Sequence, residues 1–200
     1  MATGILALQG AFIEHKRKLE ALGEECFEIR QAHDLRQPFT RLVLPGGEST
    51  TQAKLLRELE LLAPLRNRII DGMPVLATCA GLILLAERVE GTGDLQNLNP
   101  AAGTKRMQVQ GFGTLPVTVR RNAYGRQLGS FHTQESFGQL GVVPMTFIRA
   151  PFITEVRSPA HTLATCEGNI VAVQSGNQLG MAFHPELDED NRIHELFLKL

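Results

Sequence analysis

The sequence predicts one α/β domain, with a mainly parallel sheet flanked by helices and a smaller antiparallel element. In the first part of the chain, short apolar runs alternate with amphipathic runs, which is typical of a parallel sheet covered by helices on both faces. From Gly113 onward the pattern changes to short strand-like runs separated by turns, which indicates antiparallel pairing. A length of 200 residues and a hydrophobic content of 43% suffice for a single domain, residues 1–200, with a substantial core.

The elements of the parallel part follow from apolar runs and from the residues that start or end helices. The first helix carries Phe12, Leu19 and Leu22 among charged residues, and Gly23 is placed to end it. Pro64 favours a helix start, because the first helical turn needs no N–H from that position. We expect strands at 4–8, 26–29, 41–44 and 74–78, and helices at 11–22, 50–62, 64–70 and 80–86.

The second part of the chain is predicted to add short strands and a closing helix. We expect strands at 115–119, 146–149, 153–156, 161–165, 170–173 and 178–183, and a helix from about 189 to 198. The acidic run from Asp188 to Asp190 would form the first turn of that helix, where the macrodipole favours negative charge. Residues 91–114 are rich in Gly, Asn, Gln and Pro, and we interpret this segment as a surface excursion, with its main part at about 97–114.

Composition argues against several classes of function. The net charge of −1 gives no electrostatic basis for binding nucleic acid or a membrane surface. No apolar stretch reaches the roughly 18 residues that a transmembrane helix needs, and the N-terminus lacks the basic region and cleavage pattern of a secretory signal. Three cysteines are an odd number without framework spacing, so we expect free thiols and a cytoplasmic location.

Cys79 is the strongest candidate for a catalytic residue. An apolar strand-like run precedes it, and a run of strong helix formers begins at Ala80. A cysteine at a strand-to-helix turn lies at a helix N-terminus, where free N–H groups and the macrodipole favour the thiolate. Small residues around the turn, Ala77, Ala80 and Gly81, permit the tight bend of a nucleophile elbow.

The motif His184-Pro185-Glu186 supplies the partners that a nucleophilic cysteine needs. It follows the strand-like run 178–183, which would deliver the histidine to the end of the sheet, as the strand before Cys79 delivers the cysteine. The imidazole would act as general acid and base, and the carboxylate would orient it. Together Cys79, His184 and Glu186 predict an acyl-transfer site.

A glycine-rich turn, Pro45-Gly46-Gly47-Glu48-Ser49, follows the third predicted strand. It lacks the Gly-Lys-Ser/Thr ending of a phosphate-binding loop. A turn before a helix N-terminus still presents backbone N–H groups, which can hold the oxyanion of a tetrahedral intermediate. The alternative interpretation is a tight turn with Ser49 as the N-cap, and the two interpretations are compatible.

Other reactive or polar residues form no comparable pattern. Cys26 and Cys166 lie in strand-like runs and are interpreted as core residues. His132 and Glu135 form one weak metal-like pair, more typical of local structure. The histidines outside the motif are scattered without paired ligand spacing, and they are His15, His33, His132, His161 and His194. We therefore expect no metal and no bound cofactor.

Six segments, which follow one another along almost the whole chain, carry a family resemblance. They are Leu8-Gln-Gly-Ala11 with Glu14-His15, Leu44-Pro-Gly-Gly-Glu-Ser-Thr-Thr51, Thr78-Cys-Ala-Gly-Leu82, Arg121-Asn-Ala-Tyr-Gly-Arg-Gln127, Phe147-Ile-Arg-Ala-Pro151 and Phe183-His-Pro-Glu-Leu187. Together they resemble the class I, triad-type glutamine amidotransferases. The second and fourth segments resemble more narrowly the glutaminase subunits of pyridoxal 5′-phosphate synthase.

This resemblance implies a three-layer, flavodoxin-like fold and a glutaminase that converts L-glutamine to L-glutamate and ammonia. The ammonia would pass to a separate synthase component with a (β/α)8 barrel, on which pyridoxal 5′-phosphate forms. By the same resemblance, Gly47 and Ala80 would form the oxyanion hole, and Gln9 is a candidate interface or gating residue. Glutamine binding would involve Gly46, Gly47, Glu48, Ser49, Arg121, Ile148 and Arg149.

Two of these expectations have a physical basis of their own. Arg121 and Arg149 suit the substrate's α-carboxylate, because a planar guanidinium matches a carboxylate. Gly46 and Gly47 can flip a peptide at little cost, so docking of the synthase could complete the oxyanion hole.

The sequence also departs from the family pattern, and other functions stay open. Ala77 stands where the family usually has glycine, and alanine would strain the turn if that residue has positive φ. The chain is also longer than typical relatives between Gln96 and Val117. One alternative is a different Cys-His hydrolase on a similar fold, and another is a non-catalytic binding module of flavodoxin-like type. Labelling by a glutamine-mimicking electrophile at Cys79 would distinguish them.

Overall fold

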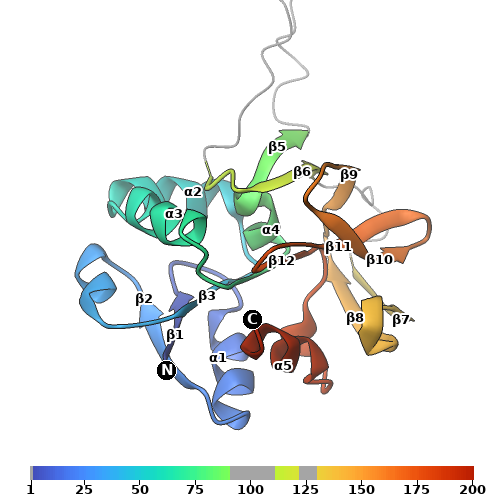
Figure 1. The fold of residues 1–200 in the computed structure, drawn as a ribbon, viewed down its shortest axis with the longest axis horizontal. Helices are drawn as coiled ribbons and strands as arrows, with labels where there is room; N and C mark the ends of the chain where they lie inside the picture. The colour runs from blue at the N-terminus through green and yellow to red at the C-terminus, as the bar shows by residue number, and fades with distance from the viewer. Residues whose placement is uncertain (1, 91–110, 122–129) are drawn as a thin grey trace, which may run out of the picture.

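The computed structural model describes residues 2–90, 111–121 and 130–200 (Figure 1). Within these ranges, ten strands form one large sheet and two strands form a small one. The strands of the large sheet are β1 (Ala2–Leu6), β2 (Glu25–Ile29), β3 (Arg41–Leu44), β4 (Val75–Thr78), β5 (Ala86–Glu90), β6 (Leu115–Arg120), β9 (Phe152–Val156), β10 (His161–Cys166), β11 (Asn169–Ser175) and β12 (Gln178–Met181). The small sheet pairs β7 (Ser130–Ser136) with β8 (Val142–Ile148) in antiparallel register.

The large sheet combines a parallel half with an antiparallel half. Its strand order is β2-β1-β3-β4-β12-β11-β9-β6-β5, and β10 pairs with β11. The strands from β2 to β12 are parallel to one another, whereas β11 runs antiparallel to β12, β9 and β10. The carboxyl ends of β3, β4 and β12 therefore meet at one edge.

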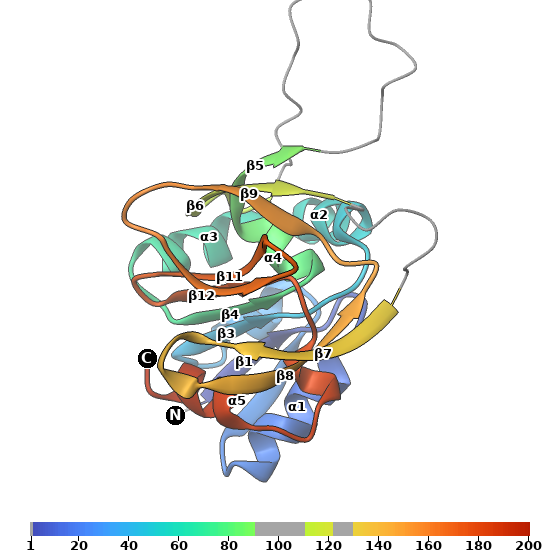
Figure 2. The ribbon, with the colours of Figure 1, turned by 90° about the vertical axis from the view of Figure 1, so that its right-hand side faces the viewer.

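Helices cover both faces of the sheet, so the molecule has three layers (Figures 1 and 2). One face carries α1 (Phe12–Ala21) and α5 (Arg192–Leu198), and the other carries α2 (Ser49–Glu58), α3 (Leu62–Ile70) and α4 (Ala80–Leu85). Three short 3₁₀ turns are η1 (Ala32–Arg36), η2 (Gly138–Leu140) and η3 (Pro185–Leu187). The predicted fold class, a mainly parallel sheet flanked by helices with a smaller antiparallel element, is confirmed.

Burial explains why the positions of the central strands could be predicted from the sequence. The side chains of β4 are all buried, as are three of the four in β3, because helices lie on both sides. Such strands appear as continuous apolar runs. The predicted helix 50–62 is shorter in the structure, because Glu60 adopts a φ of 56° that ends one helix before the next begins.

Several predicted boundaries were wrong, and two strands were missed. The apolar run after Cys79 does not stay helical to Ala86, where β5 begins. Strand β7 was missed because its exposed and half-buried side chains are polar for the most part. The final helix starts at Arg192 and not at 189, so the acidic run precedes it. Asp190 instead accepts hydrogen bonds from the backbone and side chain of Arg192.

The predicted surface excursion at about 97–114 is wrong at its C-terminal end. Residues 97–110 lie outside the described residues. Phe112, by contrast, is 1% exposed, and its N–H donates to Leu84 O at 2.7 Å. Its own carbonyl accepts a 2.7 Å hydrogen bond from Arg66 Nε of α3. The chain therefore packs onto the core before β6 begins.

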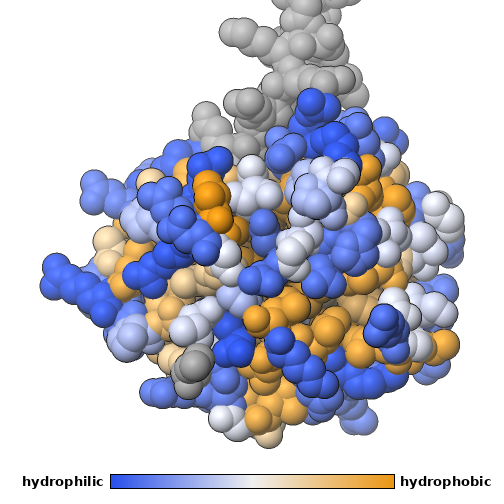
Figure 3. Space-filling model, in the orientation of Figure 1, coloured by the Kyte–Doolittle hydropathy of each residue, from blue (hydrophilic) through white to orange (hydrophobic). Residues whose placement is uncertain are grey.

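The surface carries few large hydrophobic side chains. In the view of Figure 3, hydrophobic residues are interspersed among hydrophilic ones. The exposed large hydrophobic residues of the described ranges are Ile13, Ile70, Val142, Ile148 and Leu187. Within those ranges, no helix is long and apolar enough to cross a membrane.

Candidate active site

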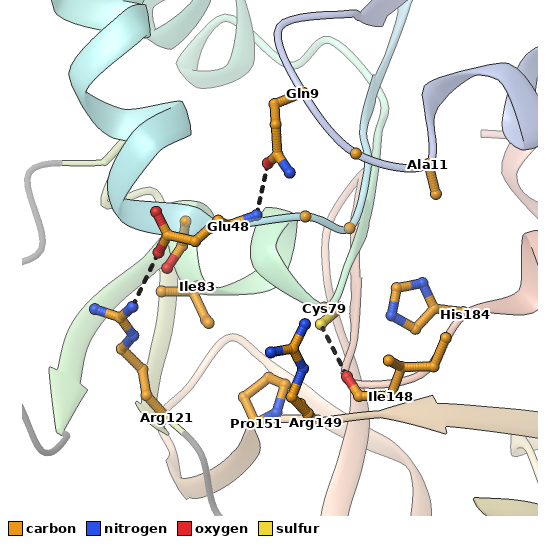
Figure 4. A pocket seen from close by; sticks show the side chains of 14 residues that line it. Gln9, Ala11, Glu48, Cys79, Ile83, Arg121, Ile148, Arg149, Pro151 and His184 are labelled. Carbon is orange, nitrogen blue, oxygen red and sulfur yellow. Dashed lines mark hydrogen bonds and ion pairs between the residues drawn. The ribbon is translucent and has the colours of Figure 1, made fainter. Parts of the chain in front are cut away.

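Cys79 lies in the turn between β4 and α4, at the carboxyl end of the strand (Figure 4). Its φ of 48° and ψ of −99° form a backbone conformation that costs a non-glycine residue about 1–3 kcal/mol. The Cys79 N–H donates to Met181 O of β12 at 2.8 Å, which ties the turn to the neighbouring strand. A Cβ atom on Gly81 would lie 2.0 Å from Leu44 O, so glycine is required for α4 to start this close to β3. The strand–turn–helix context that the sequence predicted is therefore present.

Ala77 does not carry the strain that its place in the motif suggested. It lies inside β4, paired with Leu44 of β3 and Gly180 of β12, and it is fully buried. Ala77 is not among the residues with positive φ, whereas Cys79 is. The departure from the usual glycine is therefore accommodated by an ordinary strand conformation.

His184 and Glu186 lie just beyond β12, where the chain turns into η3. His184 Nδ1 lies 2.6 Å from Glu186 Oε1, and both side chains are at least nine-tenths buried. A carboxylate accepts only, so Nδ1 carries the proton and Nε2 is left for the pocket. A Cβ atom on Gly46 would lie 2.3 Å from His184 Cε1, which shows how closely the imidazole packs on the glycine turn.

The surroundings of His184 favour its charged form. Burial alone would lower the pKa of His184, but hydrogen bonds to Cys79 and Glu186 outweigh burial and raise the pKa to about 10. Burial likewise opposes the charge on Glu186, yet His15 and His184 on either side hold the pKa of that carboxyl below its ordinary value. The imidazolium therefore lies beside Cys79, where it can give a proton to a leaving group.

A cavity of about 330 Å³ opens in front of these residues (Figure 4). Its lining includes these residues predicted from the sequence: Gln9, Gly46, Gly47, Glu48, Ser49, Cys79, Arg121, Ile148, Arg149 and His184. Glu186 lies behind His184, and Ala80 is 1% exposed, so neither side chain reaches the cavity. The cavity thus brings together loops that follow β1, β3, β4, β6, β8 and β12.

Four lining residues were not predicted from the sequence. Gly10, Ala11 and Pro151 belong to segments that resemble the family, but the resemblance gave them no role. Ile83 lies one helical turn after Cys79, and this i, i+4 spacing was the available signal.

Glu48 and Arg121 form a charged pair at one end of the cavity (Figure 4). The Glu48 carboxylate caps α2 by accepting from the N–H groups of Thr50 at 3.0 Å and Thr51 at 2.7 Å. Although burial opposes the charge, these bonds lower the pKa of Glu48 to about 2. Arg121 Nη2 lies 3.3 Å from Glu48 Oε1 and donates to Thr50 Oγ1 at 3.1 Å. The cavity therefore offers both a fixed carboxylate and a guanidinium.

Arg149 provides a second guanidinium to the cavity, on the side of Cys79 (Figure 4). Its φ of 45° is unusual for a side-chain-bearing residue, and Figure 4 shows the side chain directed into the cavity. The preceding carbonyl, Ile148 O, lies 4.0 Å from Cys79 Sγ. This segment therefore lies directly beside the candidate nucleophile.

The glycine turn is held by hydrogen bonds with three residues, Thr78, Ala11 and Gln9. Gly46 N–H donates to Thr78 Oγ1 at 3.0 Å, and Gly46 O accepts from Ala11 N–H at 3.1 Å. Glu48 N–H donates to Gln9 Oε1 at 2.6 Å. In a planar trans peptide the N–H points opposite to the carbonyl. The Gly47 N–H is therefore directed away from Ala11.

His15 lies near the site, although no motif in the sequence assigned it a catalytic part. Its Nε2 lies 3.3 Å from Glu186 Oε2, and neither side chain is exposed. Its position in the sequence could have indicated burial, because Phe12, His15 and Leu19 share one face of α1. Within the described ranges, no group of three or more His, Cys, Asp or Glu side chains is arranged to hold a metal ion.

Comparisons with known proteins agree on one family. The family model of the SNO glutamine amidotransferase family matches residues 5–200. The chain is 57% identical over 198 residues to "Pyridoxal 5′-phosphate synthase subunit PdxT" of Desulfitobacterium hafniense strain DSM 10664 / DCB-2, covering 99% of this chain and 92% of the relative. It is 50% identical over 200 residues to the protein of the same name from Methanocorpusculum labreanum, covering 100% and 97%.

Solved structures of similar fold include a glutamine amidotransferase. A crystal structure of a glutamine amidotransferase matches with a TM-score of 0.86 and 38% identity, covering 100% of this chain and 98% of that one. A structure of PurLQS from Thermotoga maritima matches with a TM-score of 0.64 and 12% identity, covering 99% of this chain and 97% of that one. The second likeness concerns the fold alone.

Proposed function

This chain belongs to the SNO glutamine amidotransferase family, and from that premise we propose that it is the glutaminase subunit of a pyridoxal 5′-phosphate synthase. It hydrolyses L-glutamine to L-glutamate and ammonia and supplies the ammonia to a synthase subunit. The observation that carries this proposal is the cavity in which Cys79 and His184 meet, with His184 held by Glu186 at 2.6 Å. The names of the relatives at 57% and 50% identity support the choice of synthase.

The first half of the reaction forms a thioester. The Cys79 thiolate attacks the side-chain carbonyl carbon of glutamine, and the C=O electron pair moves onto oxygen. The N–H groups of Gly47 and Ala80 hold this oxyanion. As the intermediate collapses, the C–N bond breaks, and the leaving nitrogen takes a proton from the His184 imidazolium and departs as ammonia.

The second half releases glutamate. His184, now neutral, takes a proton from water, and the resulting hydroxide attacks the thioester carbon. The second tetrahedral intermediate expels the Cys79 thiolate and leaves the γ-carboxyl of glutamate. Glu186 keeps the imidazole in one orientation through both halves and stabilises its charged form.

The charged groups of the cavity suit the α-carbon end of glutamine. Glu48 carries a fixed negative charge for the α-ammonium group. Arg121 and Arg149 carry positive charge for the α-carboxylate. Gly46, Ser49 and Ile148 also line the cavity and would contact the bound glutamine. A free α-amino acid is thereby favoured over a peptide.

Gln9 is placed where docking of a synthase could act on the oxyanion hole. Its Oε1 accepts from Glu48 N–H at 2.6 Å, and a Cβ atom on Gly47 would lie 2.5 Å from the same oxygen. A partner that moved Gln9 would therefore change the position of the Gly47 peptide.

All three cysteines of the chain are free, which fits a reducing cytoplasm.

The test of this function is ammonia release from L-glutamine, with and without the matching synthase barrel subunit. We expect release of ammonia and glutamate in equal amounts, at a higher rate when the synthase is present. L-Asparagine, which is one methylene shorter, serves as the control and should give no release. The absence of any release with intact Cys79, when the synthase is shown to bind, would contradict the proposal.

A further inference from the structure

The catalytic carboxylate has a second buried neighbour besides His184. Glu186 Oε1 faces His184, whereas Glu186 Oε2 faces His15 Nε2 at 3.3 Å. Oε2 has no aligned hydrogen bond of its own among the described residues. A buried carboxylate oxygen is costly unless a donor or a positive charge compensates it. The contact with His15 supplies that compensation on this side of Glu186.

His15 is itself held in place by two further residues. His15 Nε2 lies 3.1 Å from Thr78 Oγ1, and His15 Nδ1 lies 3.1 Å from His194 Nε2 of α5. The two imidazoles are tilted by 51°, with ring centroids 5.3 Å apart. Both histidines are completely buried. A chain of polar side chains thus runs from the nucleophile into the core between α1 and α5.

The neighbours of His15 fix its tautomer. A bare Nε2 would turn its lone pair toward the negative Glu186 Oε2 3.3 Å away, so His15 Nε2 carries a hydrogen, which it donates to Thr78 Oγ1, and Nδ1 is an acceptor. His194 Nε2 must then donate to His15 Nδ1, which leaves His194 Nδ1 as an acceptor. That atom has no hydrogen-bond partner among the described residues. Leaving His194 Nδ1 without a hydrogen costs less free energy at this buried position than protonating it, because a protonated His194 would be a charged ring with an unpaired N–H.

Charge around His15 agrees with a neutral ring. Burial lowers the pKa of His15, against the opposing charge of Glu186, and burial also lowers the pKa of His194 to about 2. The other charged groups that act on His15 are His184 beyond Glu186, and Glu14 and Lys18 on α1 itself. His15 therefore acts as a neutral N–H donor and not as a second cation.

We propose that His15 is a positioning residue for the catalytic carboxylate: its Nε2–H is hydrogen-bonded to Thr78 Oγ1 and lies 3.3 Å from Glu186 Oε2, where its positive end stabilises the ionised carboxylate turned toward His184. The same imidazole also connects Glu186 to the glycine turn, because its other contact, Thr78 Oγ1, accepts a hydrogen bond from Gly46 N–H at 3.0 Å. His15 does not reach the cavity, so it acts on the rate of the chemical steps and not on glutamine binding. This inference rests on the proposed glutaminase function.

The test compares His15→Leu with His15→Gln in the complex with the synthase subunit. Glutamine places an amide N–H near the position of the imidazole Nε2, whereas leucine has no donor. For His15→Leu we expect kcat for ammonia release to fall about tenfold or more, with KM within about twofold of wild type. The acid limb of kcat should move to higher pH, because Glu186 without the polar N–H beside Oε2 takes up a proton more readily. His15→Gln should recover most of the rate.

The controls separate this inference from the function on which it rests. His33→Leu removes an exposed histidine in η1 and should leave kcat unchanged. Absence of release by the wild-type complex would count against the proposed function itself. A wild-type kcat in a folded His15→Leu variant would overturn the positioning role. Equal losses of kcat in His15→Leu and His15→Gln, at equal melting temperatures, would overturn it as well.

Discussion

Replacement of Cys79 by alanine is expected to reduce ammonia release from L-glutamine by at least about 10⁴-fold, because the variant has no nucleophile to form the thioester. Alanine keeps a Cβ atom, so the backbone strain at φ 48° is unchanged and the fold should persist. The measurement is ammonia release by the complex at saturating glutamine, together with the melting temperature of each variant.

A second cysteine provides the matched control for this experiment. Cys26 is half-buried in β2, and burial raises its pKa to about 12, so its thiol is not a nucleophile at neutral pH. Cys26→Ala should therefore retain the wild-type rate. Substantial turnover by a folded Cys79→Ala variant would show that another group performs the attack.

Replacement of Glu186 by glutamine is expected to lower kcat by about 10³- to 10⁴-fold, less than the loss of Cys79. In the wild type both carboxylate oxygens face ring nitrogens, Oε1 facing His184 and Oε2 facing His15. A glutamine side chain has one oxygen and one NH₂ group. In either orientation the NH₂ group would oppose the N–H of one of the two rings, and when that ring is His184 the imidazole loses its fixed tautomer. In both orientations the negative charge that stabilises the His184 imidazolium is lost.

The same variant should also change the titration of His184. Its pKa is raised to about 10, against burial, by hydrogen bonds to Cys79 and Glu186. Without the carboxylate, burial remains and part of the compensation is lost, so the pKa of His184 must fall. The imidazolium, which dominates in the wild type below pH 10, should then give way to the neutral ring at lower pH. An NMR titration of the His184 Cε1 resonance measures this, and an unchanged titration would contradict the assigned role of Glu186.

The sequence was most informative where one physical requirement dominates. Strands β3 and β4 are covered on both sides, so they appear as apolar runs. The turn at Cys79 is marked by small residues because α4 must start against the backbone of Leu44. The triad could be predicted for the same reason, since each member follows a strand whose carboxyl end reaches the same edge.

Other features depend on tertiary contacts that no local pattern records. Strand β7 alternates half-buried and exposed side chains, most of them polar, and only its pairing with β8 makes it a strand. Phe112 lies in a segment with the composition of a loop but packs on Leu84. His15 looks like an ordinary helical residue until Glu186, about 170 residues later in the chain, folds against it.

Covalent labelling by a glutamine-mimicking electrophile, such as a diazoketone analogue of glutamine, would determine whether Cys79 is the nucleophile of a glutamine-binding site. Peptide mapping of the labelled complex should find one equivalent on Cys79 and none on Cys26 or Cys166, with L-glutamine protecting and D-glutamine not protecting. That result requires both a reactive thiolate and a pocket that recognises the α-carbon end of glutamine. Labelling that spares Cys79, or that L-glutamine does not slow, would contradict the account.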